Sequence, residues 1–336
     1  MKFTQPELVS ILKKSKDVYP HKVSKIQINE THISWIFLTG KYAYKIKKAL
    51  KFGEVLDFST LQLRKKFCEK EVKLNKVLCN EMYRGVVKVV KQNSNLKIMN
   101  PQHSGKALEY AVKMIEIPQK YRMDKLVDTK KVNFKTIDKL TTILDNFHRY
   151  TPTGVKIKRF GQPKCMQNKV QENFRTLETL TKVNPKYEKK LLLFIKNNTK
   201  LFERRIKDKK IRDIHGDLYL KNIFIVKNRF YLYDRLEFND SLRYADIAED
   251  VAHLAMDFDF HKRKDLRRHF ISQYLEKSND FDLKNLIYFL MCFKACVRGK
   301  VSLFQAKNEP MNKKRNVFIK ESKRHFKLAD SYLTSF

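Results

Sequence analysis

Residues 213–238 read DIHGDLYLKNIFIVKNRFYLYDRLEF and place acidic and amide side chains near the ends of two apolar runs. Two apolar runs, NIFIV and RFYLYD, flank a polar break at Lys227 and Asn228, a pattern typical of two antiparallel strands joined by a tight turn. Asn tolerates the left-handed backbone conformation that such turns require. In this hairpin Asn222 opens the first strand and Asp234 closes the second, so both lie at the same end.

The length of the turn sets the pairing of these two residues. A three-residue turn (227–229) places Asn222 opposite Asp234, whereas a two-residue turn shifts the pair by one position. In either case an amide oxygen and a carboxylate lie at one end of the hairpin, just after Asp217. Hard oxygen ligands of this kind suit Mg²⁺, and a further carboxylate can accept a hydroxyl proton. The ordered set H-G-D-x-x-x-x-N, hairpin, D-x-x-E therefore predicts a phosphoryl-transfer site rather than a helix cap and two strand ends.

The composition is strongly basic. The 336 residues suffice for one large domain or two lobes, and 72 Lys and Arg against 36 Asp and Glu give a formal net charge of +36. Such a charge argues for anionic partners such as a nucleotide, RNA or a phosphorylated metabolite. A lysine-coated, solvated surface explains the same charge, so a nucleic-acid partner stays an open alternative.

The sequence lacks patterns typical of a membrane span, a signal peptide or a zinc site. No run of about 18 apolar residues predicts a membrane span, and the first residues, MKFTQPELVSILKKSKD, lack the apolar region of a signal peptide. The five cysteines are scattered, and no second pair completes a zinc site with Cys292 and Cys296. We therefore expect a cytoplasmic protein with reduced thiols and no membrane partner.

The first third of the chain predicts an antiparallel sheet with one inserted helix. After a short amphipathic helix that begins near Pro6, period-two patterns follow in HKVSKIQINE, ISWIFLTG and YAYKIKKAL. From Asp57 the apolar spacing becomes helical, with Ser59 or Thr60 as the N-cap. Strand patterns return in GVVKVVKQ, NLKIM and ALEYAVKMIEI.

The rest of the chain is mostly helical. Eight Gly and eight Pro leave few flexible joints, so we expect two lobes, 1–117 and 118–336, that share a hinge near Ile115–Pro118. Helical patterns cover 134–149, 165–182, 186–208, 242–258, 262–277, 283–306 and 312–333. The sequence thus predicts an α+β fold.

The motif HGDLYLKN followed by LYDRLEF resembles the catalytic loop of the aminoglycoside phosphotransferase-like family, whose fold is that of protein kinases. The segments THISWIFLTGKYAYKIKK, FCEKEVKLNKVL, EFNDSLRYADIAEDVAHLAMDFD and ACVRGKV resemble an uncharacterised bacterial and archaeal subfamily, over nearly the whole chain. Some of its members carry a further P-loop domain, whose GxxxxGK[ST] motif is absent here. The resemblance implies a two-lobed protein kinase-like fold that uses Mg²⁺ and ATP, with GTP as the alternative, in a nucleotide-binding lobe 1–117 and a helical lobe 118–336.

Roles for the hairpin residues follow from the resemblance. Asp217 matches the catalytic base, Asn222 a metal ligand, and Asp234 the principal Mg²⁺ ligand, the counterpart of the Asp in D-F-G. Arg-Leu replaces Phe-Gly, so no flipping Phe is expected. Glu237 binds substrate or orders the loop. Tyr219 replaces a His that is frequent in the family, which bears on substrate preference.

The nucleotide residues are expected upstream. A-Y-K at 43–45 matches the A-x-K of the third strand, so Lys45 would hold the α and β phosphates. Its partner on the following helix is Glu71, with Glu69 as the alternative. Lys47 shares the strand face of Lys45, so position alone does not exclude it.

A glycine-rich loop is absent, and the bend NETHIS at 29–34 takes its place. We expect Ser34 and Thr31 to contact phosphate there, although surface hydroxyls are commonly only solvated. Backbone groups of Glu116 and Ile117 would form hydrogen bonds with the adenine base at the hinge. An ordinary edge strand explains this segment equally well.

Further residues are expected to support the loop. Asp246 and Asp250 lie one turn apart on the expected helix, and support of the catalytic loop is favoured over metal binding for this region. His215 is expected to orient the loop backbone rather than to act as a base. His148 and His253 are expected on helix faces.

These observations favour a phosphotransferase with an alcohol group as acceptor. Tyr219 stands where protein kinases carry a Lys two residues after the base, which favours a small molecule over a protein, the target of RIO-type atypical kinases. A catalytically silent RNA- or protein-binding module is the alternative from another class. Because a field of +36 repels polycations, we expect a neutral or anionic acceptor, although Glu237, Asp240 and Glu249 can still build a local acidic pocket.

Overall fold

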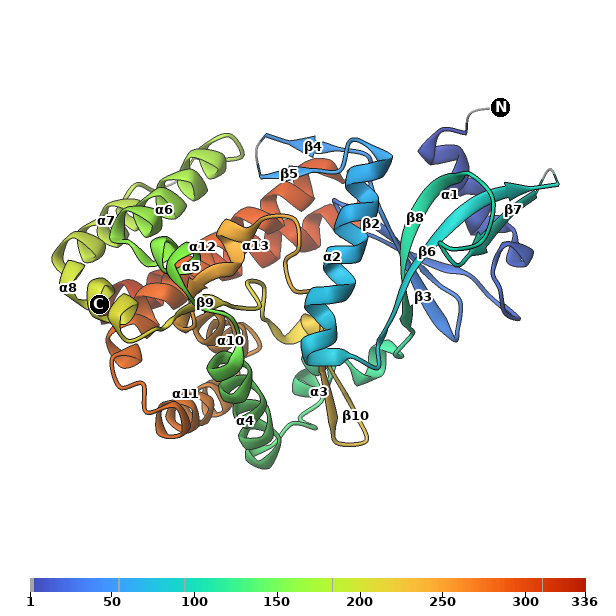
Figure 1. Ribbon diagram of the computed structural model, residues 1–336. Helices are drawn as coiled ribbons and strands as arrows, with labels where there is room; N and C mark the ends of the chain where they lie inside the picture. Colours follow the sequence, from blue (N-terminus) through green and yellow to red (C-terminus); the bar gives the residue numbers. More distant parts are fainter. Residues whose placement is uncertain (1–2, 54, 94, 183, 310) are drawn as a thin grey trace. The chain divides into compact units, whose positions relative to one another are not determined.

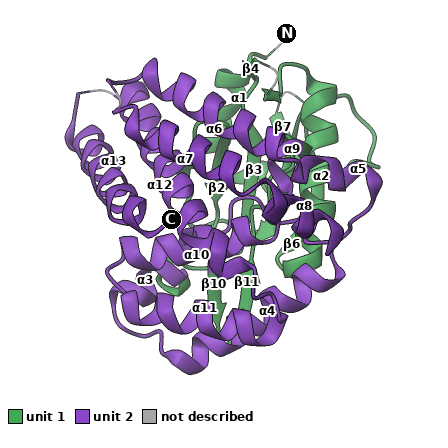
Figure 2. Ribbon diagram, turned by 90° about the vertical axis from the view of Figure 1, so that its left-hand side faces the viewer, with its two compact units in different colours: residues 1–121, 224–240 green, residues 122–223, 241–336 purple. Residues whose placement is uncertain are grey.

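The computed structural model describes residues 3–53, 55–93, 95–182, 184–309 and 311–336. They fall into two compact units, which Figure 2 shows in green and purple. The N-terminal unit comprises Met1–Tyr121 with Phe224–Asp240, and the C-terminal unit comprises Arg122–Ile223 with Ser241–Phe336. These units differ from the expected lobes at 118–121 and at 224–240, both of which belong to the N-terminal unit.

The N-terminal unit is built on a six-stranded antiparallel sheet, as the sequence predicted. Its strands, in spatial order, are β1 (Gln27–Glu30), β2 (Ser34–Leu38), β3 (Tyr42–Lys47), β8 (Ala107–Ile115), β6 (Tyr83–Gln92) and β7 (Asn95–Met99). The last strand in sequence, β8, therefore lies between β3 and β6 (Figure 1). A small ribbon that the sequence did not predict, β4 (Lys51–Phe52) and β5 (Leu56–Asp57), precedes the inserted helix.

Two helices cover the two faces of this sheet. Helix α1 (Gln5–Lys14) is capped by Thr4 and buries Leu8 and Leu12 in one apolar cluster together with Tyr44 of β3. Helix α2 (Leu61–Cys79) lies on the other face, where Cys68 packs in a cluster with Ala43 of β3. Successive strand residues point to opposite faces. Positions 43, 45 and 47 of β3 thus face α2, while 44 and 46 face α1.

Of the two candidate caps for α2, Thr60 serves. Its hydroxyl accepts a hydrogen bond from the Leu63 N–H at 3.1 Å. Ser59 instead donates to the carboxylate of Asp57.

The hairpin of the opening stretch joins the N-terminal unit through its aromatic side chains. Strands β10 (Ile223–Val226) and β11 (Arg229–Leu232) are joined by a two-residue turn, in which Lys227 and Asn228 have φ of 48° and 64°. Positive φ at both positions matches the twist of a tight hairpin. Phe224, Tyr231 and Tyr233 pack in the same apolar cluster as Cys68. The segment that follows the hairpin is therefore held against α2.

The C-terminal unit is mostly helical, and its central helix is α10 (Ala248–Phe260), of which every residue is buried. Helices α12 (Leu283–Asn308) and α13 (Lys313–Tyr332) lie side by side along much of their length (Figure 1). The other helices of this unit and of its boundary are α3 (Met123–Asp128), α4 (Phe134–Tyr150), α5 (Val155–Lys158), α6 (Pro163–Glu178), α7 (Lys186–Asn197), α8 (Thr199–Lys207), α9 (Asp240–Arg243) and α11 (Lys264–Ser278). Within the described ranges, no helix combines the length and apolarity needed to span a bilayer.

Two helical expectations are corrected. The single helix expected over 186–208 breaks at Asn198, whose side-chain amide donates to the Phe194 carbonyl at 2.9 Å and ends α7. The helix expected from 242 begins only at Ala248, because Tyr244–Asp246 form strand β12, paired with β9 (Ile211–Asp213). Pairing with a segment distant in sequence overrides the local helical pattern. Asp246 consequently does not share a helix with Asp250.

Candidate active site

In the N-terminal unit, two lysines of β3 converge on one carboxylate of α2. The Lys45 ammonium donates to Glu71 Oε1 at 2.9 Å, and the Lys47 ammonium donates to Glu71 Oε2 at 2.6 Å. Strand parity places both lysines on the α2 side, and Glu71 itself is 0% exposed. Glu69, the alternative partner, lies on the exposed face, 3.8 Å from Lys65. Glu71 is therefore the partner of Lys45.

Two acidic residues after the hairpin complete an alternating row of charges. Lys45 also donates to Asp234 Oδ1 at 2.5 Å, and Lys47 also donates to Glu237. The row runs Asp234, Lys45, Glu71, Lys47, Glu237. Only the Asp234 end reaches solvent, with a side chain 39% exposed, whereas the Glu237 side chain is 3% exposed. Lys45 is therefore the lysine beside the accessible carboxylate. Glu237 instead holds the segment after the hairpin through its buried ion pair with Lys47.

Opposite charges keep most of this row ionised despite its burial. Burial raises the pKa of a carboxyl, but the ammonium groups of Lys45 and Lys47 hold the pKa of Glu71 at about 2. Burial lowers the pKa of Lys45, but Asp234 and Glu71 raise it well above its usual range. The pKa of Glu237 is raised, because burial outweighs the attraction of Lys47.

Asp234 is fixed by its backbone and by α2. Its φ of 66° lies in the left-handed region, which non-glycine residues seldom adopt. Its N–H lies 3.3 Å from the Tyr83 hydroxyl, which accepts that hydrogen bond. The next N–H, of Arg235, donates to Asn75 Oδ1 at 2.9 Å. Asn75 was not identified from the sequence, although it lies four residues after Glu71 and thus on the same helix face.

In the C-terminal unit, Asn222 holds Asp217. The Asn222 side-chain amide donates to the Asp217 carbonyl oxygen at 2.9 Å and to its carboxylate Oδ2 at 3.3 Å. Residues Leu220–Asn222 form a single 3-10 turn, which brings the Asn222 amide back to Asp217, five positions earlier in the chain. The structure thus brings together the two residues that the sequence assigned to this loop.

Two carboxylates of the buried helix α10 anchor the loop backbone. Asp250 accepts hydrogen bonds from the His215 N–H at 2.7 Å and the Gly216 N–H at 2.9 Å. Asp257, two turns further along α10, accepts from the Leu220 N–H at 2.8 Å. These carboxylates of the buried helix α10 therefore fix the loop backbone both before and after Asp217.

The supporting residues are placed differently from the sequence reading in one respect. Asp246 pairs with Arg205 and accepts the Ala248 N–H at 2.8 Å, so it does not bond the loop directly. Asp250 does so, and His148 Nε2 lies 3.2 Å from it. Burial raises the pKa of Asp250, but the hydrogen bond and charge of His148 bring it below its ordinary value. His148 was expected merely on a helix face.

Two histidines, His215 and His253, lie near Asp217. His215 is buried, and its Nδ1 accepts the Asp217 N–H at 3.4 Å, in agreement with an orienting role. His253 Nδ1 lies 3.9 Å from Asp217 Oδ1. The ring of His253 stacks on Tyr219 with centroids 5.4 Å apart. Its position three residues after Asp250 on α10 was the available sequence signal.

The remaining nucleotide candidates take part in local structure. The Thr31 hydroxyl donates to the Ser34 carbonyl at 3.1 Å and accepts the Ser34 N–H at 3.0 Å, closing the turn between β1 and β2. Ser34 itself is fully buried. Glu116 Oε2 accepts the Gly40 N–H at 2.8 Å, and Ile117 packs in the core. Contacts of these four residues with a nucleotide stay predictions.

The expected metal ligands are suitable in kind. The Asp234 carboxylate and the Asn222 amide oxygen are hard ligands, and Mg²⁺ is commonly held by one or two protein oxygens with phosphate and water. They belong to different units. In the described ranges, no group of three or more His, Cys, Asp or Glu side chains could hold a metal by itself. Metal binding by Asp234 and Asn222 stays a prediction.

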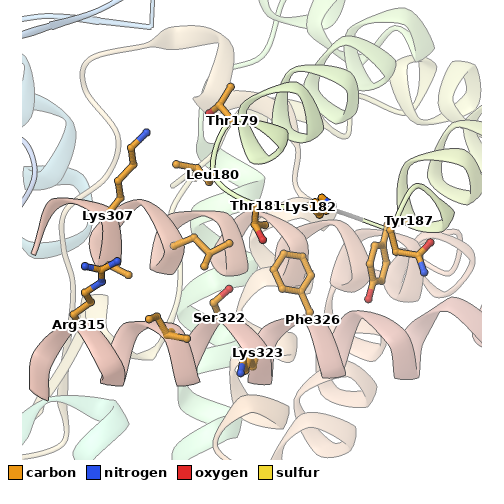
Figure 3. A pocket seen from close by; sticks show the side chains of 14 residues that line it. Thr179, Leu180, Thr181, Lys182, Tyr187, Lys307, Arg315, Ser322, Lys323 and Phe326 are labelled. Carbon is orange, nitrogen blue, oxygen red and sulfur yellow. The ribbon is translucent and has the colours of Figure 1, made fainter. Parts of the chain in front are cut away.

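A separate cavity of about 640 Å³ lies in the C-terminal unit beside α12 and α13 (Figure 3). Phe326 projects into it from α13. None of the site residues predicted from the sequence lines it. Its described lining has four cationic side chains and no carboxylate: Lys182, Lys307, Arg315 and Lys323.

Comparison with known sequences finds relatives without an assigned function. No protein-family model matches the chain. Uncharacterized proteins of Mycobacterium tuberculosis and Mycobacterium bovis are 31% identical over 282 residues, which cover 82% of this chain and 54% of theirs. The chain thus spans about half the length of these curated relatives.

Comparison with solved structures identifies the fold. A choline kinase from Cryptosporidium parvum matches with a TM-score of 0.55 and 11% identity, covering 97% of this chain and 94% of that one. An aminoglycoside 2'-phosphotransferase in complex with GDP matches with a TM-score of 0.52 and 12% identity, covering 98% of both. An ethanolamine kinase from Plasmodium vivax matches with a TM-score of 0.50 and 16% identity, covering 97% and 89%.

The chain therefore has the protein kinase-like fold of choline/ethanolamine kinases and aminoglycoside phosphotransferases. The α+β class and the fold predicted from HGDLYLKN and LYDRLEF are confirmed.

Proposed function

We propose that this chain is an ATP- and Mg²⁺-dependent phosphotransferase that moves the γ-phosphate to a hydroxyl group of a small molecule. The observation that carries the proposal is Lys45, whose ammonium lies between Glu71 at 2.9 Å and Asp234 at 2.5 Å. A lysine held by a helix carboxylate and placed beside a solvent-exposed carboxylate is the arrangement that kinases use for a nucleotide's phosphates and metal. The fold, shared with several kinases, supports the same proposal.

Each residue then has a defined task. Lys45 binds the α and β phosphates, and Asp234 and Asn222 hold Mg²⁺, which when bound neutralises charge on the phosphate oxygens. Asp217 accepts the proton of the acceptor hydroxyl. The acceptor oxygen forms a bond to the γ-phosphorus as the bond to the β-phosphate bridging oxygen breaks. The products are a phosphate ester and a nucleoside diphosphate.

The acceptor is proposed to be neutral or anionic. The formal net charge of +36 opposes the approach of a polycation and attracts an anion, and salt screens this effect. The acidic residues that could have built a local acidic pocket are paired with lysines: Glu237 with Lys47, Asp240 with Lys70, and Glu249 with Lys169 and Lys294. Offering kanamycin-type aminoglycosides beside neutral and anionic hydroxyl compounds, at low and high salt, tests this. Efficient phosphorylation of the aminoglycosides alone would refute it.

The activity itself is tested in two steps. Thermal shift with ATP or GTP, each with and without Mg²⁺, should show stabilisation that requires the metal and should identify the nucleotide. Transfer of ³²P from the γ position to a metabolite pool, followed by chromatography, should then reveal the acceptor. Nucleotide binding without transfer to metabolites but with transfer to protein would favour the atypical protein kinase. Absence of nucleotide binding, together with RNA or protein binding, would favour the silent module.

A further inference from the structure

Arg298 of α12 lies in the C-terminal unit beside the proposed catalytic base. Its guanidinium carbon is 4.4 Å from the centroid of the Tyr219 ring, two residues after Asp217. Tyr219 in turn stacks on His253. Arginine, tyrosine and histidine thus form a layered group at the edge of the loop, and Asp217 is near enough to Arg298 to influence its charge.

Among the residues that the structure describes, the partly buried Arg298 lacks the paired carboxylate that three buried arginines have. Arg64 pairs with Glu109, Arg243 with Asp213, and Arg205 with both Asp246 and Asp280. Throughout the described residues, the Arg298 guanidinium makes only the stacking contact with Tyr219 and no hydrogen bond or ion pair. The N–H donors of this guanidinium are therefore not used by the described residues, and a guanidinium with unused donors can bind an oxyanion.

The electrostatic surroundings keep this guanidinium charged. Burial lowers the pKa of Arg298, but Tyr219, Asp217 and Asp257 raise it above its ordinary value. These groups act through space, so its donors stay available for a ligand.

A second polar group at the same place lacks a partner. His253 is 3% exposed, and neither ring nitrogen has a hydrogen-bond partner among the described residues. Burial, with Lys294 and Arg298 nearby, lowers the pKa of His253 well below its usual range. The imidazole is therefore neutral, with one donor and one acceptor. It adds a neutral hydrogen-bonding group beside the unpaired cation.

We propose that Arg298 binds an oxyanion, a carboxylate or phosphate group, carried by the acceptor whose hydroxyl Asp217 orients. The proposal rests on the proposed function and sharpens its acceptor from neutral or anionic to anionic. A guanidinium presents paired donors that match two oxygens of such a group, and it stacks on an aromatic ring in a way that an ammonium does not. The Tyr219 ring, on which the guanidinium stacks, orients the plane of its paired N–H donors.

The acceptor rather than the nucleotide is the source of this anion. Arg298 and Asp217 belong to the same unit, and Asp217 is the residue proposed to contact the acceptor hydroxyl. Lys45, the residue proposed to bind the nucleotide phosphates, belongs to the other unit. Binding of the acceptor should therefore depend on Arg298, and binding of the nucleotide should not.

The kinetic test compares polyols with their carboxylate and phosphate forms, such as glycerol, glycerate and glycerol 3-phosphate, as acceptors at physiological salt. Wild type should prefer an anionic form, and the carboxylate and phosphate arms show which oxyanion is used. Arg298→Met should raise KM for that form by roughly 10- to 100-fold, with KM for ATP within about twofold, and Arg298→Lys should be intermediate because it keeps charge but loses the fork. Lys284→Met, which removes a charge from an exposed position of the same helix, should match wild type. Preference for the neutral form, or equal losses on neutral and anionic forms, would overturn the proposal.

A binding test separates this proposal from the proposed function. Calorimetric titration of the nucleotide-free protein with glycerate and with inorganic phosphate should show a site in wild type and in Lys284→Met that Arg298→Met lacks. If wild type neither binds nucleotide nor transfers phosphate, the proposed function is overturned. If wild type and Arg298→Met give identical anion isotherms, the role of Arg298 is overturned even when phosphate transfer is observed. If no compound in the panel is phosphorylated, these isotherms decide.

Discussion

Lys45 and Lys47 share one carboxylate, but their replacement should have opposite consequences. Lys47 is 0% exposed and is the partner of both Glu71 and Glu237. In Lys47→Met, Glu71 keeps Lys45, while Glu237 becomes a buried acid without its cation. Removing one partner of a buried ion pair costs about 3 to 5 kcal/mol. At roughly 2 to 4 °C per kcal/mol, the melting temperature should fall by about 6 to 20 °C, with ATP affinity in the remaining folded protein near that of wild type.

Lys45→Met should instead preserve stability and lose nucleotide affinity. Its second partner, Asp234, is 39% exposed and can be solvated, while Glu71 keeps Lys47. The loss of unfolding free energy should therefore be smaller than for Lys47→Met. ATP affinity should fall because the proposed phosphate ligand is gone.

The two variants are compared by calorimetric melting and by ATP titration well below both melting temperatures. Glu237→Gln in the Lys47→Met background should recover part of the lost stability, since it removes the uncompensated acid. The reasoning fails if Lys47→Met abolishes ATP binding at wild-type stability, or if Lys45→Met melts lower than Lys47→Met while still binding ATP.

Further predictions address the proposed base, the metal and the pH dependence. Asp217→Asn should lower turnover on the order of 10²- to 10⁴-fold with little change in ATP affinity; wild-type turnover would exclude Asp217 as the base. Asp234→Ala should abolish the Mg²⁺-dependent part of ATP binding, and an unchanged Mg²⁺ titration would contradict its assignment. Lys169 and Lys294 oppose the effect of burial and hold the pKa of Glu249 at about 2, below its ordinary 4.5. The stabilisation is therefore present above pH 4.5 and lost as pH falls toward 2, so Glu249→Gln should cost roughly 3 kcal/mol of unfolding free energy at pH 7 and much less near pH 2. Denaturant unfolding at several pH values measures this cost. A loss of unfolding free energy in Glu249→Gln that is the same at pH 7 and near pH 2 would refute the predicted pH dependence.

Local periodicity was sufficient for the elements that carry the site. Alternation along YAYKIK predicted a strand, and strand parity alone requires Lys45 and Lys47 to share a face. Helical spacing after Thr60 predicted α2, and the polar pair at Lys227 and Asn228 predicted the hairpin. These features depend on steric preferences of neighbouring residues, which the sequence contains.

Local patterns were misleading wherever a distant segment competed with them. The helical pattern from 242 includes Tyr244–Asp246, yet this segment pairs as a strand with Ile211–Asp213. Asp250 rather than Asp246 bonds the loop that contains Asp217, because Asp250 Oδ2 accepts the His215 N–H at 2.7 Å. Spacing alone treated Asp246 and Asp250 as equivalent.

The order of the amino acids sets which side chains stand at the ends of strands and on the faces of helices. Packing between remote segments sets which of these side chains meet. Lys45 binds Asp234, 189 positions away, and Lys47 binds Glu237, 190 positions away. Glu71 rather than Glu69 joins them because α2 packs one face, and not the other, against the sheet. A periodic pattern is a property of adjacent residues, whereas an ion pair requires two atoms within a few ångströms, a distance that packing between remote segments sets.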